Sequence, residues 1–263
     1  MKVFVLFLFL SSASSLAFQF PNVANIFKRL PSTLLRSEDS VLMQQKLALL
    51  QSVSYTNNGK TATPQQQAKV LSIVGDIEKR FPDLSLDDTN VLEQLNGVWY
   101  LQYTSPSIVG NKDQFPNEWK PQFAQEGDSN IETKQFNAQG SVSAAGIVVD
   151  TSNRVVQQIF NVAERSVVNN VELDFGTVRV GGPFRQSPNV PNRAIVSFDQ
   201  ADITFNNGLT LRFGFVFSLI ALARGSNDNG WLETTYLSDD IRIGRGNKGT
   251  MFVLTRDPTA VKP

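Results

Sequence analysis

The chain has 263 residues, of which 41% are hydrophobic and 18% charged, a composition typical of a globular protein. It contains no cysteine and no histidine, which excludes disulfides, thiol nucleophiles, Ser-His-Asp triads and imidazole metal ligands, and we predict no catalytic residue, metal site or cofactor. Residues 1–37 hold four basic residues and no acid. The rest of the chain has 20 basic against 24 acidic residues, a net charge of −4, which argues against nucleic-acid binding.

The first 17 residues have the pattern of a secretory signal peptide. A basic start precedes the apolar run 3–10, which is too short for a bilayer that needs about 20 residues. The alternative is a buried amino-terminal strand. Residues 18–37 are basic and hydroxylated, as in a transit peptide. A cut before Phe18 followed by such a segment resembles the two-part leaders of algae with complex plastids, which implies plastid import. Simple secretion with a pro-segment is the alternative.

Two helices are expected within residues 38–82. Apolar side chains recur at helical spacing over residues 38–54. Thr63-Pro64-Gln65-Gln66 then supplies an N-cap, a proline at the first helical position and a glutamine for a capping box, and Pro82 ends the second helix. The polar faces are rich in glutamine rather than basic, which argues against a membrane-surface role. We therefore expect both helices to cover one end or flank of the domain that follows.

From Leu95 onward the apolar pattern has a period of two, which is typical of β-strands. The strands expected between turn residues are 97–104, 155–162, 167–175, 177–180, 193–198, 203–205, 209–219 and, in a closing hairpin, 231–237, 241–244 and 250–254. Short strands at this spacing predict one antiparallel barrel or sandwich.

The strand expected over 209–219 carries a row of large apolar side chains on one face. Phe213, Phe215 and Phe217 belong to this row. In a barrel wide enough to hold a cavity, such a row would line an apolar pocket. The alternative, that the row fills the core, is the commoner fate of such side chains.

Two blocks of sequence resemble the plastid lipid-associated protein family, also called fibrillins or plastoglobulins. The first is the segment Leu95-Asn96-Gly97-Val98-Trp99-Tyr100-Leu101-Gln102-Tyr103-Thr104-Ser105, and the second is the closing hairpin 230–254. The resemblance covers residues 40–257. Ser238 and Asn247 depart from it, since each replaces an acid that is common in the family. The residues that carry the family pattern are Gly97, Trp99, Thr234, Thr235, Tyr236, Asp240, Arg242, Arg245 and Gly246.

The resemblance implies a lipocalin-like antiparallel β-barrel over 95–257, preceded by the two helices, within a family domain spanning 38–263. It also implies peripheral association with thylakoids or plastid lipid droplets and binding of fatty acids, prenylquinones or carotenoids. The expected ligand-binding residues are Trp99, Tyr103, Phe213, Phe215, Phe217 and Tyr236. Gly97-Val98-Trp99 is similar to the Gly-x-Trp strand of lipocalins, in which an arginine from a late strand covers a tryptophan at the closed end of the barrel. Arg256 or Arg242 is expected to take that role.

The charged side chains of the closing hairpin permit two interpretations. Asp239, Asp240, Arg242 and Arg245 could form a polar mouth that meets a ligand carboxylate or quinone oxygen. We favour the second interpretation, a structural ion-pair cluster.

Three functions compete at this point, and a non-catalytic lipid-binding protein is favoured. An enzyme acting on a carotenoid or oxylipin would need a buried carboxylate of raised pKa. A droplet coat protein would need only an exposed apolar patch.

Overall fold

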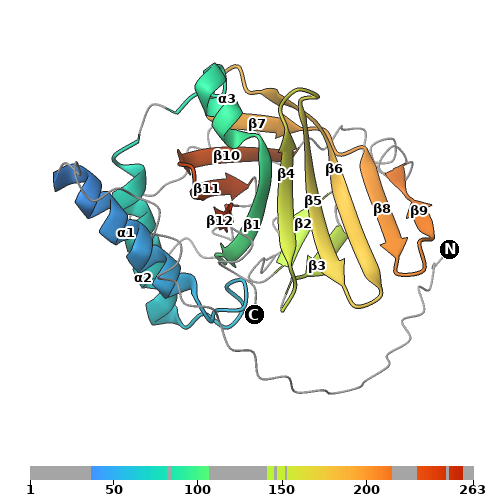
Figure 1. Ribbon diagram of the computed structural model, residues 1–263, viewed down its shortest axis with the longest axis horizontal. Helices are drawn as coiled ribbons and strands as arrows, with labels where there is room; N and C mark the ends of the chain where they lie inside the picture. Colours follow the sequence, from blue (N-terminus) through green and yellow to red (C-terminus); the bar gives the residue numbers. More distant parts are fainter. Residues whose placement is uncertain are drawn as a thin grey trace, which may run out of the picture.

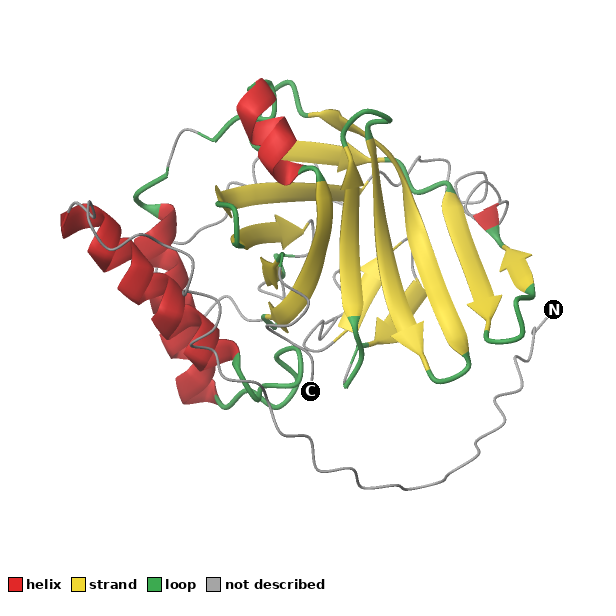
Figure 2. Cartoon of the chain, in the orientation of Figure 1, coloured by secondary structure: helices red, strands yellow, loops and turns green. Residues whose placement is uncertain are grey.

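A computed structural model describes most of the chain from the first expected helix onward (Figures 1 and 2). The residues it describes are 37–81, 84–106, 141–144, 147–151, 153–214, 230–246 and 249–256. The expected signal peptide and all of the expected transit segment except Ser37 lie outside them, as do Pro82, Phe215, Phe217 and Asn247. Within the described residues, no helix has the length and apolar composition needed to cross a membrane.

Eight antiparallel strands form a closed ring, which confirms the predicted barrel. They are β1 (Gly97–Thr104), β4 (Val156–Asn161), β5 (Ser166–Leu173), β6 (Gly176–Gln186), β7 (Arg193–Val196), β10 (Gly230–Leu237), β11 (Ile241–Gly246) and β12 (Met251–Thr255). Their order is β5-β4-β1-β12-β11-β10-β7-β6, and β6 pairs back onto β5. Closure leaves no free edge in this ring.

Two short hairpins lie outside the ring. Strands β8 (Gln200–Phe205) and β9 (Thr210–Arg212) extend the sheet from the first half of β6, whose second half pairs with β7. Strands β2 (Ser141–Ala144) and β3 (Ile147–Asp150) form a separate hairpin.

The prediction that the side chains from residue 209 onward point into the barrel is wrong for Leu209 and Leu211. Leu209 and Leu211 are 55% and 40% exposed. The alternation identified side chains that share a face, but β9 pairs only with β8 among the described strands and does not belong to the ring. Phe213 packs against Val180 and Ala201 in a small cluster of its own.

Helices α1 (Ser37–Val53) and α2 (Pro64–Glu78) form a layer beside β10, β11 and β12 (Figure 1). The predicted capping box is present, since Thr63 Oγ1 accepts from the amide of Gln66 while the Gln66 side chain accepts from the amide of Thr63. Leu49, Val74 and Ile77 are fully buried in the cluster between this layer and the strands.

A third helix, α3 (Thr89–Leu95), was not predicted. Its seven residues make too few turns to show a helical period. The sequence feature that could have indicated this helix is its N-cap residue, Asp88. In the structure the Asp88 side chain accepts a hydrogen bond of 2.8 Å from the main-chain amide of Asn90. The helix lies over one end of the ring (Figure 1), and Leu92 and Leu95 pack into the barrel core.

The barrel wall separates two apolar clusters because alternate residues of each strand face opposite sides. On β11, Ile241 and Ile243 pack outward against the helices. On β12, Met251 and Val253 also pack outward, whereas Leu254 packs into the interior.

The inner cluster combines residues from every strand of the ring except β11 with three leucines at the α3 end. Its buried members are Leu86, Leu92, Leu95, Trp99, Leu101, Val156, Phe160, Val167, Val171, Phe184, Ala194, Val196, Leu237 and Leu254. The barrel interior is therefore mostly apolar.

Candidate functional site

The closed end of the barrel is built around Trp99. This side chain is fully buried, and its Nε1 donates a hydrogen bond of 2.9 Å to the main-chain oxygen of Leu95, the last residue of α3. The guanidinium carbon of Arg256 lies 4.2 Å from the centroid of the Trp99 ring. The sequence analysis expected Arg256 or Arg242 to cover Trp99, and the structure shows that Arg256 does so. Such stacking contributes about 0.5–2 kcal/mol.

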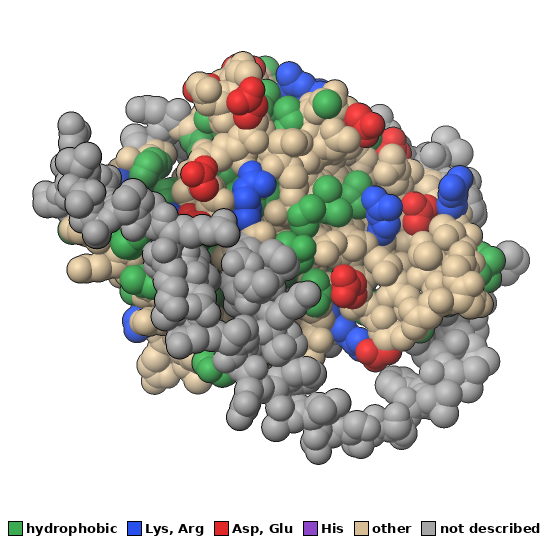
Figure 3. Space-filling view, in the orientation of Figure 1, with side chains coloured by type: hydrophobic (Ala, Val, Ile, Leu, Met, Phe, Trp, Pro, Cys, Tyr) green, Lys and Arg blue, Asp and Glu red, His purple; other side chains and the backbone are tan. Residues whose placement is uncertain are grey.

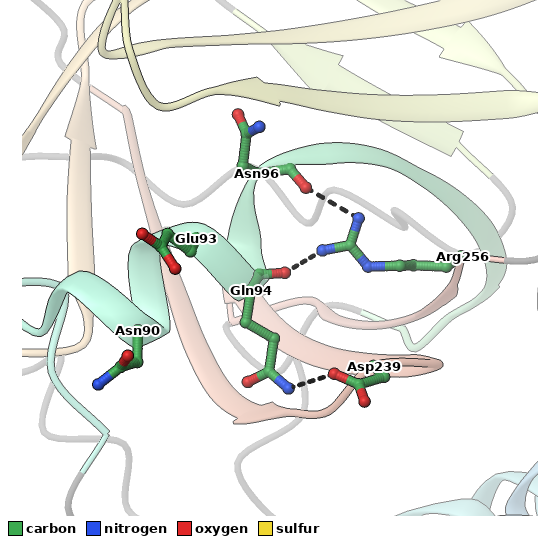
Figure 4. Close-up of a pocket in the computed structure, with 6 residues that line it drawn as sticks. All are labelled: Asn90, Glu93, Gln94, Asn96, Asp239 and Arg256. Atoms are coloured by element: carbon green, nitrogen blue, oxygen red, sulfur yellow. Dashed lines mark hydrogen bonds between the residues drawn. The ribbon is translucent and has the colours of Figure 1, made fainter.

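Arg256 also ties the end of β12 to α3 (Figure 4). It donates to the main-chain oxygens of Gln94 and of Asn96, the latter at 2.8 Å. Burial lowers the pKa of Arg256, and the nearby Asp239 opposes this shift. An open cleft of about 600 Å³ lies here, lined by Asn90, Glu93, Gln94, Asn96, Asp239 and Arg256. The residues that line this cleft are all polar or charged, whereas pockets for apolar ligands are lined mainly by hydrophobic and aromatic side chains.

Gly97 lets Arg256 approach the barrel end closely. Its φ of +109° lies in the region that favours glycine, and a Cβ atom there would sit 2.9 Å from Nη1 of Arg256. This contact gives a physical reason for the glycine of the Gly97-Val98-Trp99 element.

A polar cluster lies inside the barrel, centred on Arg242 of β11. This side chain is 1% exposed. Its Nε donates to Thr234 Oγ1 at 3.1 Å, and its Nη1 donates to Oε1 of Gln158 on β4. Gln158 in turn donates to Asn169 Oδ1 on β5 at 2.9 Å.

The hydrogen bond from Arg242 to Gln158 crosses the barrel interior. Strands β1 and β12 lie between β11 and β4 in the ring, so a direct contact between their side chains has to span the inside. The guanidinium carbon of Arg242 also lies 4.7 Å from the centroid of the Phe160 ring, another inner residue of β4. Arg242, Gln158, Asn169 and Thr234 thus form one polar layer in an otherwise apolar interior, and we call them the inner polar cluster.

Arg242 differs from two other buried arginines in lacking an acidic partner. Arg193 pairs with Glu233 at 2.7 Å, and Arg245 pairs with Glu78 at 2.8 Å. Among the described residues, no carboxylate pairs with Arg242. Burial lowers the pKa of Arg242 to about 9, so the side chain remains cationic at neutral pH.

The other charged residues of the closing hairpin hold the helical layer and α3 against the barrel. Asp240 pairs with Lys46 of α1 and accepts a hydrogen bond of 2.8 Å from Ser238 Oγ. Asp239 accepts a hydrogen bond of 2.8 Å from the side chain of Gln94 on α3. Together with the Arg245–Glu78 pair, these contacts support the structural interpretation for the hairpin acids and Arg245, which stays a prediction. Arg242 is separated from them by the barrel wall.

The structure places several expected ligand-binding residues on different sides of the wall. Trp99 faces inward, whereas Tyr103 and Tyr236 lie in the outer cluster beneath the helices. Tyr236 meets Phe81 edge to face, with ring centroids 4.9 Å apart. Ligand binding by these residues stays a prediction.

Two irregularities in strand pairing explain the outward position of the tyrosines. On β1 the register shifts between Leu101 and Tyr103, and on β10 it shifts between Thr234 and Tyr236. Each bulge inserts one extra residue and reverses the alternation of faces. In the second bulge Thr235 Oγ1 donates to the main-chain oxygen of Ile243 at 3.3 Å.

Gln158 and Asn169 of the inner polar cluster were not singled out in the sequence. A signal existed for Gln158, because it falls between Val156 and Phe160 on the face of β4 that alternation predicts to be buried. A polar residue on a buried face needs a hydrogen-bonding partner, so its position pointed to a polar contact inside the barrel. Within the described part of the chain, no group of 3 or more acidic side chains converges as metal ligands.

The closed ring, the tryptophan–arginine pair at one end and the apolar interior define a lipocalin-like barrel protein. The comparison with protein families then gives the particular family. The chain matches PAP_fibrillin over residues 43–120 and 133–255, and it belongs to that family. This confirms the resemblance to plastid lipid-associated proteins.

Several curated plant proteins are similar over most of the chain. The light-induced chloroplastic protein of Solanum tuberosum is 27% identical over 84% of this chain and 69% of its own length. The chromoplast-specific carotenoid-associated protein C2 of an Oncidium hybrid cultivar is 27% identical, with coverages of 82% and 70%. Plastid lipid-associated protein 2 of Brassica campestris is 26% identical, with coverages of 86% and 74%. The comparison with solved structures gives no match.

Proposed function

We propose that this chain is a non-catalytic plastid protein that binds a hydrophobic small molecule inside its barrel. The observation that carries the proposal is the closed ring of strands with an apolar inner face, capped at one end by Trp99 and Arg256. Fatty acids, prenylquinones and carotenoids are the candidate ligands, because each presents the extended apolar surface that such an interior buries.

We further propose that it acts at thylakoids or plastid lipid droplets of an alga with a complex plastid. The names of the relatives support a plastid location, since they describe chloroplastic or chromoplastic proteins associated with lipids or carotenoids. The basic leader of residues 1–37 supports import into such a plastid.

The enzyme alternative receives less support from the described residues. Asp240, one of the acids of the closing hairpin, pairs with Lys46 of the helical layer outside the barrel. A general acid must reach the reacting atoms within hydrogen-bonding distance, and an acid on the outer side of the wall does not reach a ligand inside it.

An exposed apolar patch favours the coat protein as a second candidate. Phe175, Leu209 and Leu211 are 50%, 55% and 40% exposed. The turn that carries Phe175 is joined to the turn that precedes Leu209, because the main-chain amide of Asn206 donates to the Phe175 main-chain oxygen at 3.0 Å. Leu211 follows on β9. Elsewhere, the face seen in Figure 3 mixes basic and acidic side chains without a large region of one sign.

Displacement of a neutral dye separates interior binding from patch binding. The full chain is saturated with Nile red, and oleic acid, a prenylquinone and a carotenoid are titrated against it. We expect at least one of them to displace one dye per chain, in the double variant Leu209→Asp, Leu211→Asp as well as in the unaltered protein. Failure of all three to displace the dye, or loss of binding in the double variant, would contradict interior binding.

A further inference from the structure

The inner polar cluster places a cation where the barrel interior otherwise offers apolar surface. An isolated ion buried at low dielectric loses its hydration, and this loss costs several kcal/mol even after the protein relaxes. Arg242 recovers part of this through Thr234, Gln158 and the ring of Phe160, which are all neutral. Its charge is therefore left uncompensated by the described residues.

The guanidinium of Arg242 keeps hydrogen-bonding capacity beyond these contacts. Its Nε and Nη1 are engaged, but the structure records no hydrogen bond from Nη2 to any described residue. The neighbouring inward position on the same strand is Gly244, where a Cβ atom would lie 2.8 Å from the main-chain oxygen of Glu233 and 3.4 Å from Nη2 of Arg242. Because residue 244 is a glycine, it places no side chain next to Nη2.

From this cluster we infer that the ligand bears a carboxylate, which pairs with Arg242 while the hydrocarbon chain lies along the apolar inner face. The inference rests on the proposed function, since it assumes that the interior is the binding site. A long-chain fatty acid fits this description. Prenylquinones and carotenes have no anionic group and would leave the buried cation without a counter-charge.

The single positive charge favours a carboxylate over a phosphate. One carboxylate brings one negative charge and accepts hydrogen bonds from a guanidinium in a planar arrangement. A phosphate monoester carries a charge of about −1.5 to −2 at neutral pH, so one arginine would leave excess negative charge inside the barrel. The side-chain amides of Gln158 and Asn169 add neutral hydrogen-bonding groups beside the same site.

The first test compares an acid with its ester on the unaltered full chain. Oleic acid and methyl oleate share one hydrocarbon chain and differ in charge. In Nile red displacement we expect oleic acid to bind at least about ten-fold more tightly, which corresponds to about 1.4 kcal/mol. Equal affinities, or tighter binding of the ester, would overturn the inference and leave the proposed function intact. If no hydrophobic probe binds, the proposed function itself fails.

The second test asks whether Arg242 causes the tighter binding of oleic acid compared with methyl oleate. In Arg242→Gln, oleic acid should lose about ten-fold or more in affinity while methyl oleate binds as before, and Arg242→Lys should restore part of the preference. The control is Arg179→Gln, which removes an arginine that is exposed on β6 and should change neither affinity. Equal weakening of acid and ester in a folded Arg242→Gln protein would show that the arginine acts only through the structure.

A spectroscopic measurement tests whether the bound carboxylate pairs with a cation, even if neither Arg242 variant folds. Oleic acid labelled with carbon-13 at its carboxyl group is bound to the unaltered full chain, and its resonance is followed as the pH is lowered. Pairing with a cation favours the ionised carboxyl, so the bound ligand should titrate at lower pH than the same acid in phospholipid vesicles. Titration at the same or higher pH would contradict the inference.

Discussion

Arg242 should reduce the stability of the ligand-free protein. Its burial lowers its pKa to about 9, which means that the folded state binds this proton less tightly than the unfolded chain does. The penalty is complete below about pH 9 and diminishes as the pH rises from there towards the ordinary pKa of arginine. At neutral pH the protein therefore carries the whole cost of this charge.

Arg242→Met is expected to leave the free energy of unfolding unchanged or raise it by about 1–3 kcal/mol at neutral pH. The change removes a buried charge, and replacing buried ionic groups by apolar ones of similar volume is often neutral or stabilising. The hydrogen bonds to Thr234 and Gln158 are lost, which offsets part of the gain. Urea unfolding of delipidated full-length protein measures the difference. A loss of more than about 3 kcal/mol would show that Arg242 stabilises the ligand-free fold.

The burial of Tyr103 should make the free energy of unfolding decrease in alkali. Its hydroxyl is buried without a hydrogen-bond partner among the described residues, and burial raises its pKa to about 12. The unfolded phenol ionises near pH 10, so this contribution to stability is complete below about pH 10 and is lost as the pH rises towards 12.

Tyr103→Phe should raise the free energy of unfolding by about 1 kcal/mol at neutral pH, because it removes an unpaired buried hydroxyl. The gain should be larger at about pH 11. Urea unfolding at both pH values measures it, with Tyr55→Phe as the control, since Tyr55 is 74% exposed. Lipid affinity should not change, as Tyr103 lies outside the barrel wall. Weaker lipid binding would instead support the ligand-binding role predicted from the sequence.

The sequence grouped Arg242 with Asp240 and Arg245 because the three are neighbours along the chain. In the structure Arg242 points into the barrel, while the other two contact the helical layer. Alternation along β11 does predict opposite faces for Arg242 and Ile243. What it cannot predict is a partner such as Gln158, which is 84 residues away in the chain and depends on how the ring closes.

At the scale of elements, the helical layer is held to β11 by a largely buried ion pair. The side chains of Arg245 and Glu78 are 8% and 15% exposed. We expect Glu78→Gln to lower the free energy of unfolding by about 1.5–3 kcal/mol, because a hydrogen bond to a charged group contributes about that much. Thermal or urea unfolding measures the loss, and the exposed Glu164→Gln is the control. A change of less than about 0.5 kcal/mol would mean that the pair does not hold the helices in place.

Helix and strand positions were largely predictable, whereas the faces that some strands present were not. The capping box at Thr63 and the alternation along β1 are local patterns, and both elements formed where the residues indicated. Bulges within β1 and β10 then turned Tyr103 and Tyr236 outward. A bulge depends on how two strands pair, so the sequence of one strand does not reveal it.

For the whole molecule, the closed barrel was predictable from many short strands and from the family resemblance. The position of β8 and β9 outside the ring was not, because they have the same period of two as the barrel strands. This arrangement leaves two surfaces that could meet a lipid. One is the interior with the inner polar cluster, and the other is the exposed patch of Phe175, Leu209 and Leu211.

Photo-crosslinking tests most directly which surface binds lipid. A fatty acid carrying a diazirine in its chain is bound to the full-length protein and irradiated, and the labelled residues are located by peptide mass spectrometry. We predict adducts on inner-face residues such as Val171, Phe184 and Leu254, which an excess of oleic acid abolishes. Adducts confined to Phe175, Leu209 and Leu211 would contradict interior binding and favour a protein that coats lipid surfaces.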